Sequence, residues 1–223
     1  MSVISAIAPL TRPAGRFELQ IEGKESAILS LDAIERLQLA VGKSVAGLEE
    51  RIFREAAQLK VYDRALNMLA FRARSSSELA RSLVRKGEEK PHVDWAIERL
   101  QEQGLLDDTA FAQSFTRAKV LGAKQSRRRV QQDLARKGVS RTVSDAAIET
   151  VFEEEGIDQR ELVEEVARKK LRALRDLEPK ARRRRLYAFL ARRGYDADDI
   201  RRAMDAVGSA LLVSGEDEGG EEE

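Results

Sequence analysis

The chain has 223 residues, of which 35% are charged and only 5% aromatic, and its formal net charge is +1. So few aromatic residues do not favour one large core, whereas several small helical units with charged outer faces fit this composition. The absence of cysteine excludes disulfides and thiolate metal sites, and without an apolar run of about 18 residues or a secretory signal we expect a cytoplasmic protein with no membrane span.

The first 60 residues differ in pattern from the rest of the chain. Residues 1–14 contain two prolines and no sustained period, so we expect a flexible leader. In the segment 15–60, Phe17, Leu19 and Ile21 alternate with polar residues before a turn, which indicates a β-hairpin. Two helices should follow, over residues 32–39 and 47–60. We therefore expect a small α/β segment here.

A short phrase of the form Leu-x-basic-basic-Gly occurs three times, and its glycines are Gly87, Gly138 and Gly194. Their separations of 51 and 56 positions are typical of a helical array. Apolar residues stand eight and four positions before each glycine and share one face of a helix. Further apolar residues recur nine, ten and thirteen positions after it, beyond expected N-caps at Ser140 and Asp196. Each unit is predicted to contain a helix, a glycine in the left-handed conformation that ends it, and a second helix.

The fold class is therefore mostly α, a tandem array of three three-helix repeats after the α/β segment. The repeats are predicted over residues 61–106, 107–157 and 158–213. Residues 214–223 form an acidic tail that we expect to be disordered. It holds six carboxylates, and without them 40 basic and 33 acidic side chains remain, a net charge of +7. The tail could compete for a polyanion-binding surface on the basic body, although a solubility tail is the simpler interpretation.

Within the array, caps and apolar spacing set the expected helix boundaries. Ser75 with Glu78 forms a capping box, Pro91 and Pro179 suit first helical turns, and Asp107 with Asp108 should cap the next helix. In that helix Phe111 and Phe115 are expected to form the buried stripe. Trp95 and Tyr187 are predicted to be core residues, and His92 a plain surface histidine.

The sequence offers no constellation for catalysis. With one histidine and no cysteine, a nucleophile and its base are hard to assemble, and the paired carboxylates are better explained by capping and solvation. Gly42-Lys43-Ser44 lacks the first glycine of a phosphate-binding P-loop, because position 37 is leucine. We expect no enzyme activity, no metal and no cofactor.

In its residues 62–207 the chain resembles the RecX family. The resemblance rests on the three glycine phrases, on Gly104-Leu105-Leu106-Asp107-Asp108 followed by Phe111, Ala112 and Phe115, and on Ser126-Arg127. It implies a bent array of three-helix repeats, usually monomeric and cytoplasmic, that lies along the groove of the filament formed by the RecA recombinase on DNA. It further implies that such proteins block filament extension and suppress strand exchange, ATP hydrolysis and stimulated self-cleavage of the LexA repressor.

Groove binding requires a basic surface, and arginine suits phosphates and carboxylates through its fixed fork of donors. The candidate filament- and DNA-facing residues lie in three clusters, one in each repeat. They are Arg81, Arg85 and Lys86; Arg127, Arg128, Arg129, Arg136 and Lys137; and Arg182, Arg183, Arg184, Arg185, Arg192 and Arg193. For the basic pair before each glycine, a simpler role is to complement the helix dipole. The runs 127–129 and 182–185 favour function, because like charges so close are unfavourable without an anion.

Two alternatives from other classes stay open. A stand-alone DNA-binding protein would carry a recognition helix with Asn, Gln and Arg at its N-terminal end, which no repeat clearly shows. Such a protein would also bind duplex DNA strongly without the recombinase. A scaffold that binds only proteins would show salt-insensitive partner binding. We expect the chain to bind the RecA filament, and single- or double-stranded DNA weakly and without sequence preference.

Overall fold

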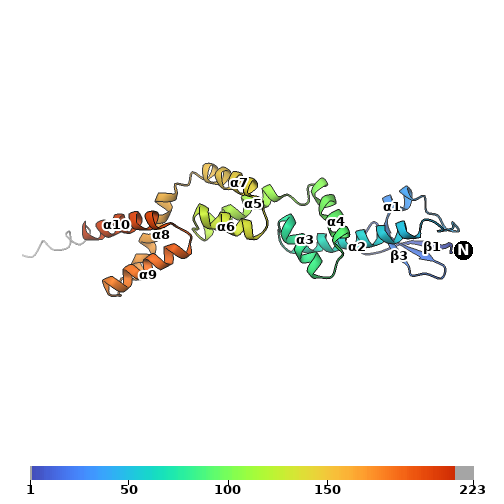
Figure 1. Cartoon of the computed structure of the whole chain (residues 1–223), viewed down its shortest axis with the longest axis horizontal. Coiled ribbons are helices and arrows are strands. Elements are labelled where there is room, and N and C mark those ends of the chain that lie inside the picture. Colours follow the sequence, from blue (N-terminus) through green and yellow to red (C-terminus); the bar gives the residue numbers. More distant parts are fainter. Residues whose placement is uncertain (1, 214–223) are drawn as a thin grey trace, which may run out of the picture. The chain divides into compact units, whose positions relative to one another are not determined.

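The computed structural model describes residues 2–213, and the side chains of residues 2–208. These residues fold into three strands and ten α-helices with a π-helical turn, in two compact units that divide between Asp107 and Asp108 (Figure 1). The mostly helical prediction is confirmed. The acidic tail lies outside the described residues. No helix among the described residues is long and apolar enough to cross a membrane.

The N-terminal segment is a three-stranded antiparallel sheet in the order β1-β2-β3, followed by a short helix. Its elements are β1 (Ile4–Pro9), β2 (Arg16–Ile21), β3 (Ala27–Ser30) and α1 (Leu31–Arg36). The predicted hairpin is β2 and β3, in which Leu19 pairs with Ala27. The predicted leader is wrong, because β1 pairs with β2 through Ile7 and Leu19. Its alternation is obscured by small residues, and Pro9 is tolerated because it ends an edge strand.

A single long helix, α2 (Glu49–Phe71), joins this sheet to the first repeat, where the sequence predicted a break near residue 60. The helix contains no glycine or proline, so nothing in its sequence ends it. Its first half packs Ile52 in the core of the sheet, and its second half packs Val61 and Ala65 in the core of repeat 1. One helix therefore belongs to both cores.

A bidentate ion pair also links the sheet to α2. Arg16 on β2 donates from Nε and Nη2 to the carboxylate of Asp63, at 3.0 and 2.5 Å. The side chains are only 16% and 25% exposed, so water screens this pair less than a surface pair. The hydrogen bond to Asp63 raises the pKa of Arg16, against the smaller opposing effect of its burial.

The predicted array of helix trios is present, each trio with its own core. Repeat 1 ends the first unit and combines the second half of α2 with α3 (Ser76–Arg85) and α4 (Lys90–Glu102). The second unit holds repeat 2, with α5 (Asp108–Arg117), the π-helical turn Ala118–Gly122, α6 (Arg127–Arg136) and α7 (Arg141–Glu154). It also holds repeat 3, with α8 (Gln159–Arg172), α9 (Pro179–Arg192) and α10 (Ala197–Val213).

The apolar residues eight and four positions before each glycine face the core, as predicted. The inward pairs are Leu79 with Leu83, Val130 with Leu134, and Leu186 with Leu190, and each of these side chains is at most 2% exposed. Gly87, Gly138 and Gly194 have φ values of 86°, 80° and 88° and so lie in the left-handed region. The caps predicted at Ser140 and Asp196 are also confirmed, since Ser140 accepts from the amide of Val143 and Asp196 from that of Asp199.

One predicted core position is wrong, and three others are only partly buried against their cores. Tyr187 is 46% exposed, because it is one residue past Leu186 and points about 100° away from the buried stripe. Phe111 and Phe115 stack on each other at 6.0 Å but are only half-buried. Trp95 is half-buried against the core of repeat 1. His92 is not a plain surface residue, because its side chain is only 18% exposed.

The third glycine differs from the first in its surroundings. A Cβ added at Gly194 would lie 2.5 Å from Cβ of Arg129 and 2.8 Å from Oγ of Ser126, whereas a Cβ at Gly87 would meet nothing within 4 Å. Gly194 therefore allows repeats 2 and 3 to approach closely, in addition to ending α9.

Alanine substitutions at Gly87 and Gly194 separate the cost of a left-handed backbone from the cost of disturbing the close approach of repeats 2 and 3. Gly87→Ala should cost about 1–2 kcal/mol, the cost of a left-handed alanine. Gly194→Ala should cost more, by about 1–3 kcal/mol of overpacking. Urea unfolding would be followed by Trp95 fluorescence, which reports the first unit, and by far-UV circular dichroism. We expect Gly87→Ala to shift the Trp95 transition and Gly194→Ala to shift only the dichroism. Equal costs would mean that the close approach at Gly194 contributes nothing.

Candidate polyanion-binding surface

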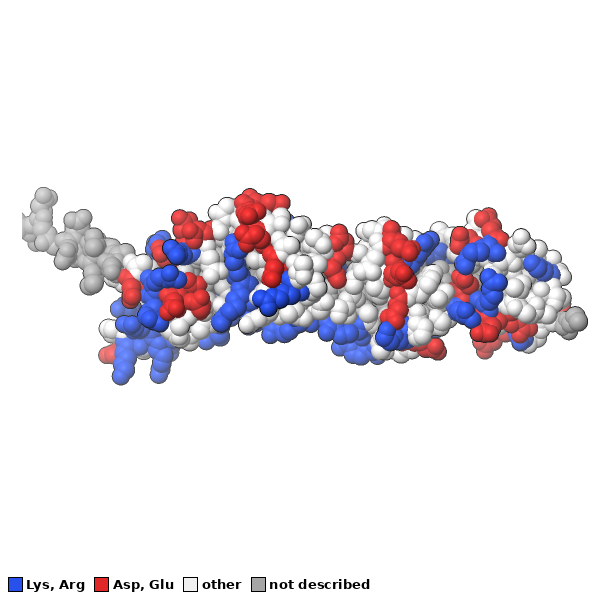
Figure 2. Space-filling view, turned by 45° about the horizontal axis from the view of Figure 1, so that its top comes forward, with Lys and Arg blue, Asp and Glu red and all other residues white. Residues whose placement is uncertain are grey.

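Helix α9 carries the densest group of cations in repeat 3. Leu186 and Leu190 face the core, whereas Arg183, Arg184 and Arg185, which precede them on the same helix, are exposed. Figure 2 shows Lys and Arg gathered at the lower left, over α9. Among the described residues, no carboxylate lies within 4.0 Å of the charged nitrogens of Lys180 or of these three arginines. Their charges are therefore available to an external anion.

Part of this surface is hollowed into a groove between α9 and α10, with a volume of 440 Å³. The residues that line it are Lys180, Arg183, Arg184, Tyr187, Arg201 and Met204. The groove thus combines an exposed aromatic ring and a thioether with four cations. Of these cations, Arg201 has an internal partner, Asp198, at 2.9 Å.

The arginines at the start of α6 are placed differently. Arg127 forms an ion pair with Glu149, and its guanidinium lies 4.0 Å from the ring centroid of Phe152. Arg128 donates from Nε to the carbonyl of Gly194 at 3.2 Å. Nε of Arg129 is buried and lies 3.4 Å from Asp133, an ion pair without a hydrogen bond. The anions and acceptors that such a dense basic run requires are therefore supplied by the protein itself, and an external role for these three residues stays a prediction.

Arg128 belongs to a joint between repeats 2 and 3, within the second unit. The amide of Ser126 donates to the carbonyl of Arg193 at 3.1 Å, and Nε of Arg193 donates to the carbonyl of Ala123 at 3.2 Å. The hydroxyl of buried Tyr195 donates to the carbonyl of Lys124 at 3.0 Å, and burial raises its pKa. The sequence analysis missed this joint, because its bonds connect residues that are some 70 positions apart.

The other predicted residues fall into two groups. Arg136 forms an ion pair with Asp133, and Nζ of Lys137 lies 5.4 Å from the ring centroid of Phe115. The remaining predicted cations lie on the surface. They are half-buried Arg182 and exposed Arg192 of repeat 3, and exposed Arg81, Arg85 and Lys86 of repeat 1. One of them, Lys86, lines a hollow of repeat 1 beside Met68 and Phe71, where Arg64 and Arg74 are held by Glu88 and Glu78.

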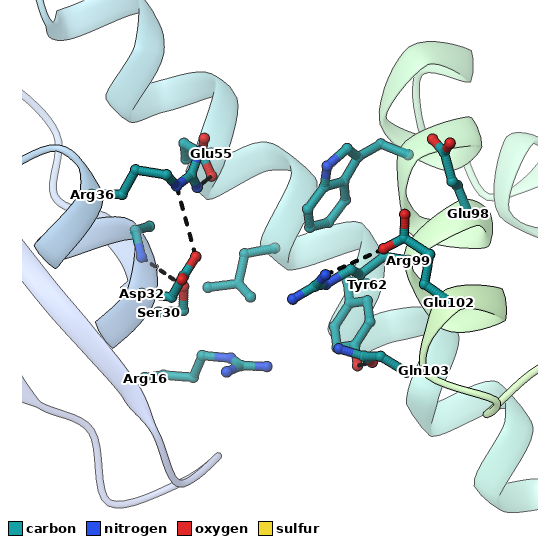
Figure 3. A pocket seen from close by; sticks show the side chains of 13 residues that line it. Arg16, Ser30, Asp32, Arg36, Glu55, Tyr62, Glu98, Arg99, Glu102 and Gln103 are labelled. Carbon is teal, nitrogen blue, oxygen red and sulfur yellow. Dashed lines mark hydrogen bonds and ion pairs between the residues drawn. The ribbon is translucent and has the colours of Figure 1, made fainter.

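The first unit contains a pocket of 520 Å³ between the sheet, α1, α2 and α4 (Figure 3). Three arginines line it, but each is held by a carboxylate of the protein. Arg16 binds Asp63, Arg36 binds Glu55 at 3.0 Å, and Arg99 binds Glu102 at 3.2 Å. The hydrogen bond to Glu55 raises the pKa of Arg36. Because its cations are neutralised, this pocket is a poorer anion site than the α9 groove. No group of three potential metal ligands occurs among the described residues.

Three sequence models of the RecX family match the helix trios in order. The first three-helix domain matches residues 62–100, the second residues 107–148 and the third residues 158–204. A regulatory protein RecX from Chlorobaculum tepidum is 35% identical over 153 residues, which cover 69% of this chain and 91% of that protein. The chain belongs to the RecX family. A regulatory protein RecX from Halorhodospira halophila is 34% identical over 157 residues, which cover 68% of this chain and 91% of that protein.

Solved structures of RecX proteins agree with this fold. A crystal structure of regulatory protein RecX superimposes with a TM-score of 0.73 at 23% identity, and covers 92% of this chain and 100% of its own. The RecX from Lactobacillus salivarius superimposes with a TM-score of 0.57 at 18% identity, and covers 68% of this chain. These structures show the fold, while the family models and the regulatory proteins above confirm the predicted family.

Methionine substitutions at Arg127 and Arg184 distinguish an arginine with internal partners from one without. Arg127→Met loses an ion pair and a cation–π contact, so we expect a loss of stability of about 1–2 kcal/mol and little change in polyanion affinity. Arg184→Met should leave the stability within about 0.5 kcal/mol and weaken binding. Urea unfolding and heparin-column elution measure the two effects. The reverse pattern would show that α6, and not α9, presents the binding surface.

Proposed function

We propose that this RecX protein binds the RecA–DNA filament and mainly inhibits its growth, ATP hydrolysis, strand exchange and coprotease activity in recombination and DNA repair. The observation that supports this proposal best is the group of α9 cations that lack partners among the described residues, beside an open groove. A regulator of this kind acts by occupying a surface, so it needs no reactive group. We further propose that it acts as a cytoplasmic monomer.

The charges of α9 suit a filament that presents phosphates. Contacts between arginine and phosphate position a protein on nucleic acid without reading its sequence, and their strength falls steeply with salt. Lys180 and Arg183–Arg185 have the free donors that such contacts require. A protein-only scaffold would not need so many uncompensated cations on one helix.

A stand-alone DNA-binding protein remains the second candidate. Three-helix units can place a recognition helix in the major groove, where Asn, Gln and Arg near its N-terminal end read base edges. The N-terminal half of α9 carries a lysine and four arginines and neither Asn nor Gln. This composition favours phosphate contacts over the reading of base sequence.

The test is the DNA-dependent ATP hydrolysis of RecA, titrated with this protein at two salt concentrations. We expect inhibition below one protein per RecA subunit, because blocking filament extension at one end affects many subunits. Arg183→Glu/Arg184→Glu should weaken inhibition at least about tenfold and reduce its salt dependence, by roughly 0.7 in logarithmic slope for each lost single-strand phosphate contact. The charge-matched control is Arg51→Glu/Lys60→Glu on α2, at two exposed cations outside the α9–α10 groove.

Either of two results would contradict this proposal. If RecA hydrolysis is unaffected while the protein binds bare duplex DNA tightly, the stand-alone DNA-binding function is correct. If both double variants inhibit as well as the natural sequence does, the recombinase remains the partner and α9 is not the contact surface.

A further inference from the structure

The groove of repeat 3 places an aromatic ring in line with cations. On α9, Lys180, Arg183, Arg184 and Tyr187 stand at positions i, i+3, i+4 and i+7, which share one face of a helix. Residues with these spacings have Cβ atoms about 5–6 Å apart. The ring of Tyr187 therefore lies within reach of the same ligand as the guanidinia of Arg183 and Arg184.

The opposite wall of the groove comes from Arg201 and Met204 on α10. No carboxylate lines the groove, and its uncharged lining is the Tyr187 ring and the Met204 thioether. Tyr187 is 46% exposed, so a ligand in the groove can reach its side chain. The groove can thus hold a ligand that has both a flat apolar face and flanking negative charges.

Single-stranded nucleic acid has this combination of groups. Proteins bind it by stacking its bases on aromatic side chains while a positively charged groove follows its backbone. A duplex offers phosphates, but its bases are stacked on each other and present no free face. An acidic peptide would satisfy the cations and leave the ring without a stacking partner.

We propose that the α9–α10 groove binds a single strand of nucleic acid, with one base stacked on Tyr187 and the adjoining phosphates on Lys180, Arg183 and Arg184. This inference deepens the proposed function, because it uses the same cationic helix. It adds that the surface distinguishes an unpaired strand from a duplex. Its test requires no recombinase.

The experiment measures fluorescence anisotropy of three labelled probes with the full chain at one salt concentration. The probes are a 15-nucleotide oligothymidylate, an abasic oligonucleotide of the same length, and a duplex of the same length. We expect oligothymidylate to bind about 5- to 150-fold more tightly than the abasic strand, the range that corresponds to one stacked base. This comparison uses the natural sequence, so it does not depend on the folding of a variant.

Variants then locate the stacked base. Tyr187→Leu should weaken oligothymidylate binding by about the same 5- to 150-fold and leave abasic binding unchanged, and Tyr187→Phe should keep the affinity of the natural sequence. Phe71→Leu is the matched control, because Phe71 is 85% exposed on repeat 1, in a hollow whose Arg64 and Arg74 are held by Glu88 and Glu78. Arg183→Glu/Arg184→Glu should weaken binding of both single strands.

Three outcomes would overturn the inference. Equal binding of oligothymidylate and the abasic strand would exclude stacking, as would equal effects of Tyr187→Leu on the two. Complete competition by polyglutamate at equal charge concentration would identify an acidic protein segment as the ligand class. In each case the effect of Arg183→Glu/Arg184→Glu on RecA hydrolysis would still decide the proposed function separately.

Discussion

The structure depends on one local constraint, a helix whose two inward apolar residues lie eight and four positions before a left-handed glycine. The inward pair anchors the helix in a small core, and the glycine reverses the chain so that the next helix covers that core. Each trio buries few large side chains, so exact placement of the turn matters more than it would in a larger core. With φ values of 80–88° at all three positions, the constraint is met in the same way in each repeat.

The same local motif nevertheless has different surroundings in different repeats. At Gly87 the turn faces open space, whereas at Gly194 it lies against Ser126 and Arg129 of the preceding repeat. This contact explains the separate roles of the basic helices. Arg128 and Arg193 donate to backbone carbonyls across the joint, so their charges serve the packing of repeats 2 and 3. On α9 the run from Arg183 to Arg185 has no such neighbour, and it remains on the surface.

Features that depend on nearby residues were predictable from the sequence, and features that depend on distant partners were not. The inward pairs, the glycine stops and the caps at Ser75 and Ser140 follow from spacings within one helix and its turn. Strand β1 could not be found in this way, because its pairing with β2 compensates for its weak alternation. The groove was predictable only in part. The arginine run suggested a surface, but the exposure of Tyr187 and the neighbouring wall of α10 require the packed trio.

Charge pairing also explains why the two units differ as candidate binding surfaces. Exposed ion pairs contribute little to stability, so the arginines on the open surface, unlike Arg128 and Arg193 at the joint, are not needed to hold the folds together. What pairing changes is the field that an approaching polyanion meets. In the first unit Arg16, Arg36 and Arg99 each face a carboxylate, and their charges are cancelled where they stand. On α9 the carboxylates are absent from the groove, so the same residue type gives an attractive surface. The number of arginines in a repeat therefore says less about binding than the positions of the carboxylates beside them.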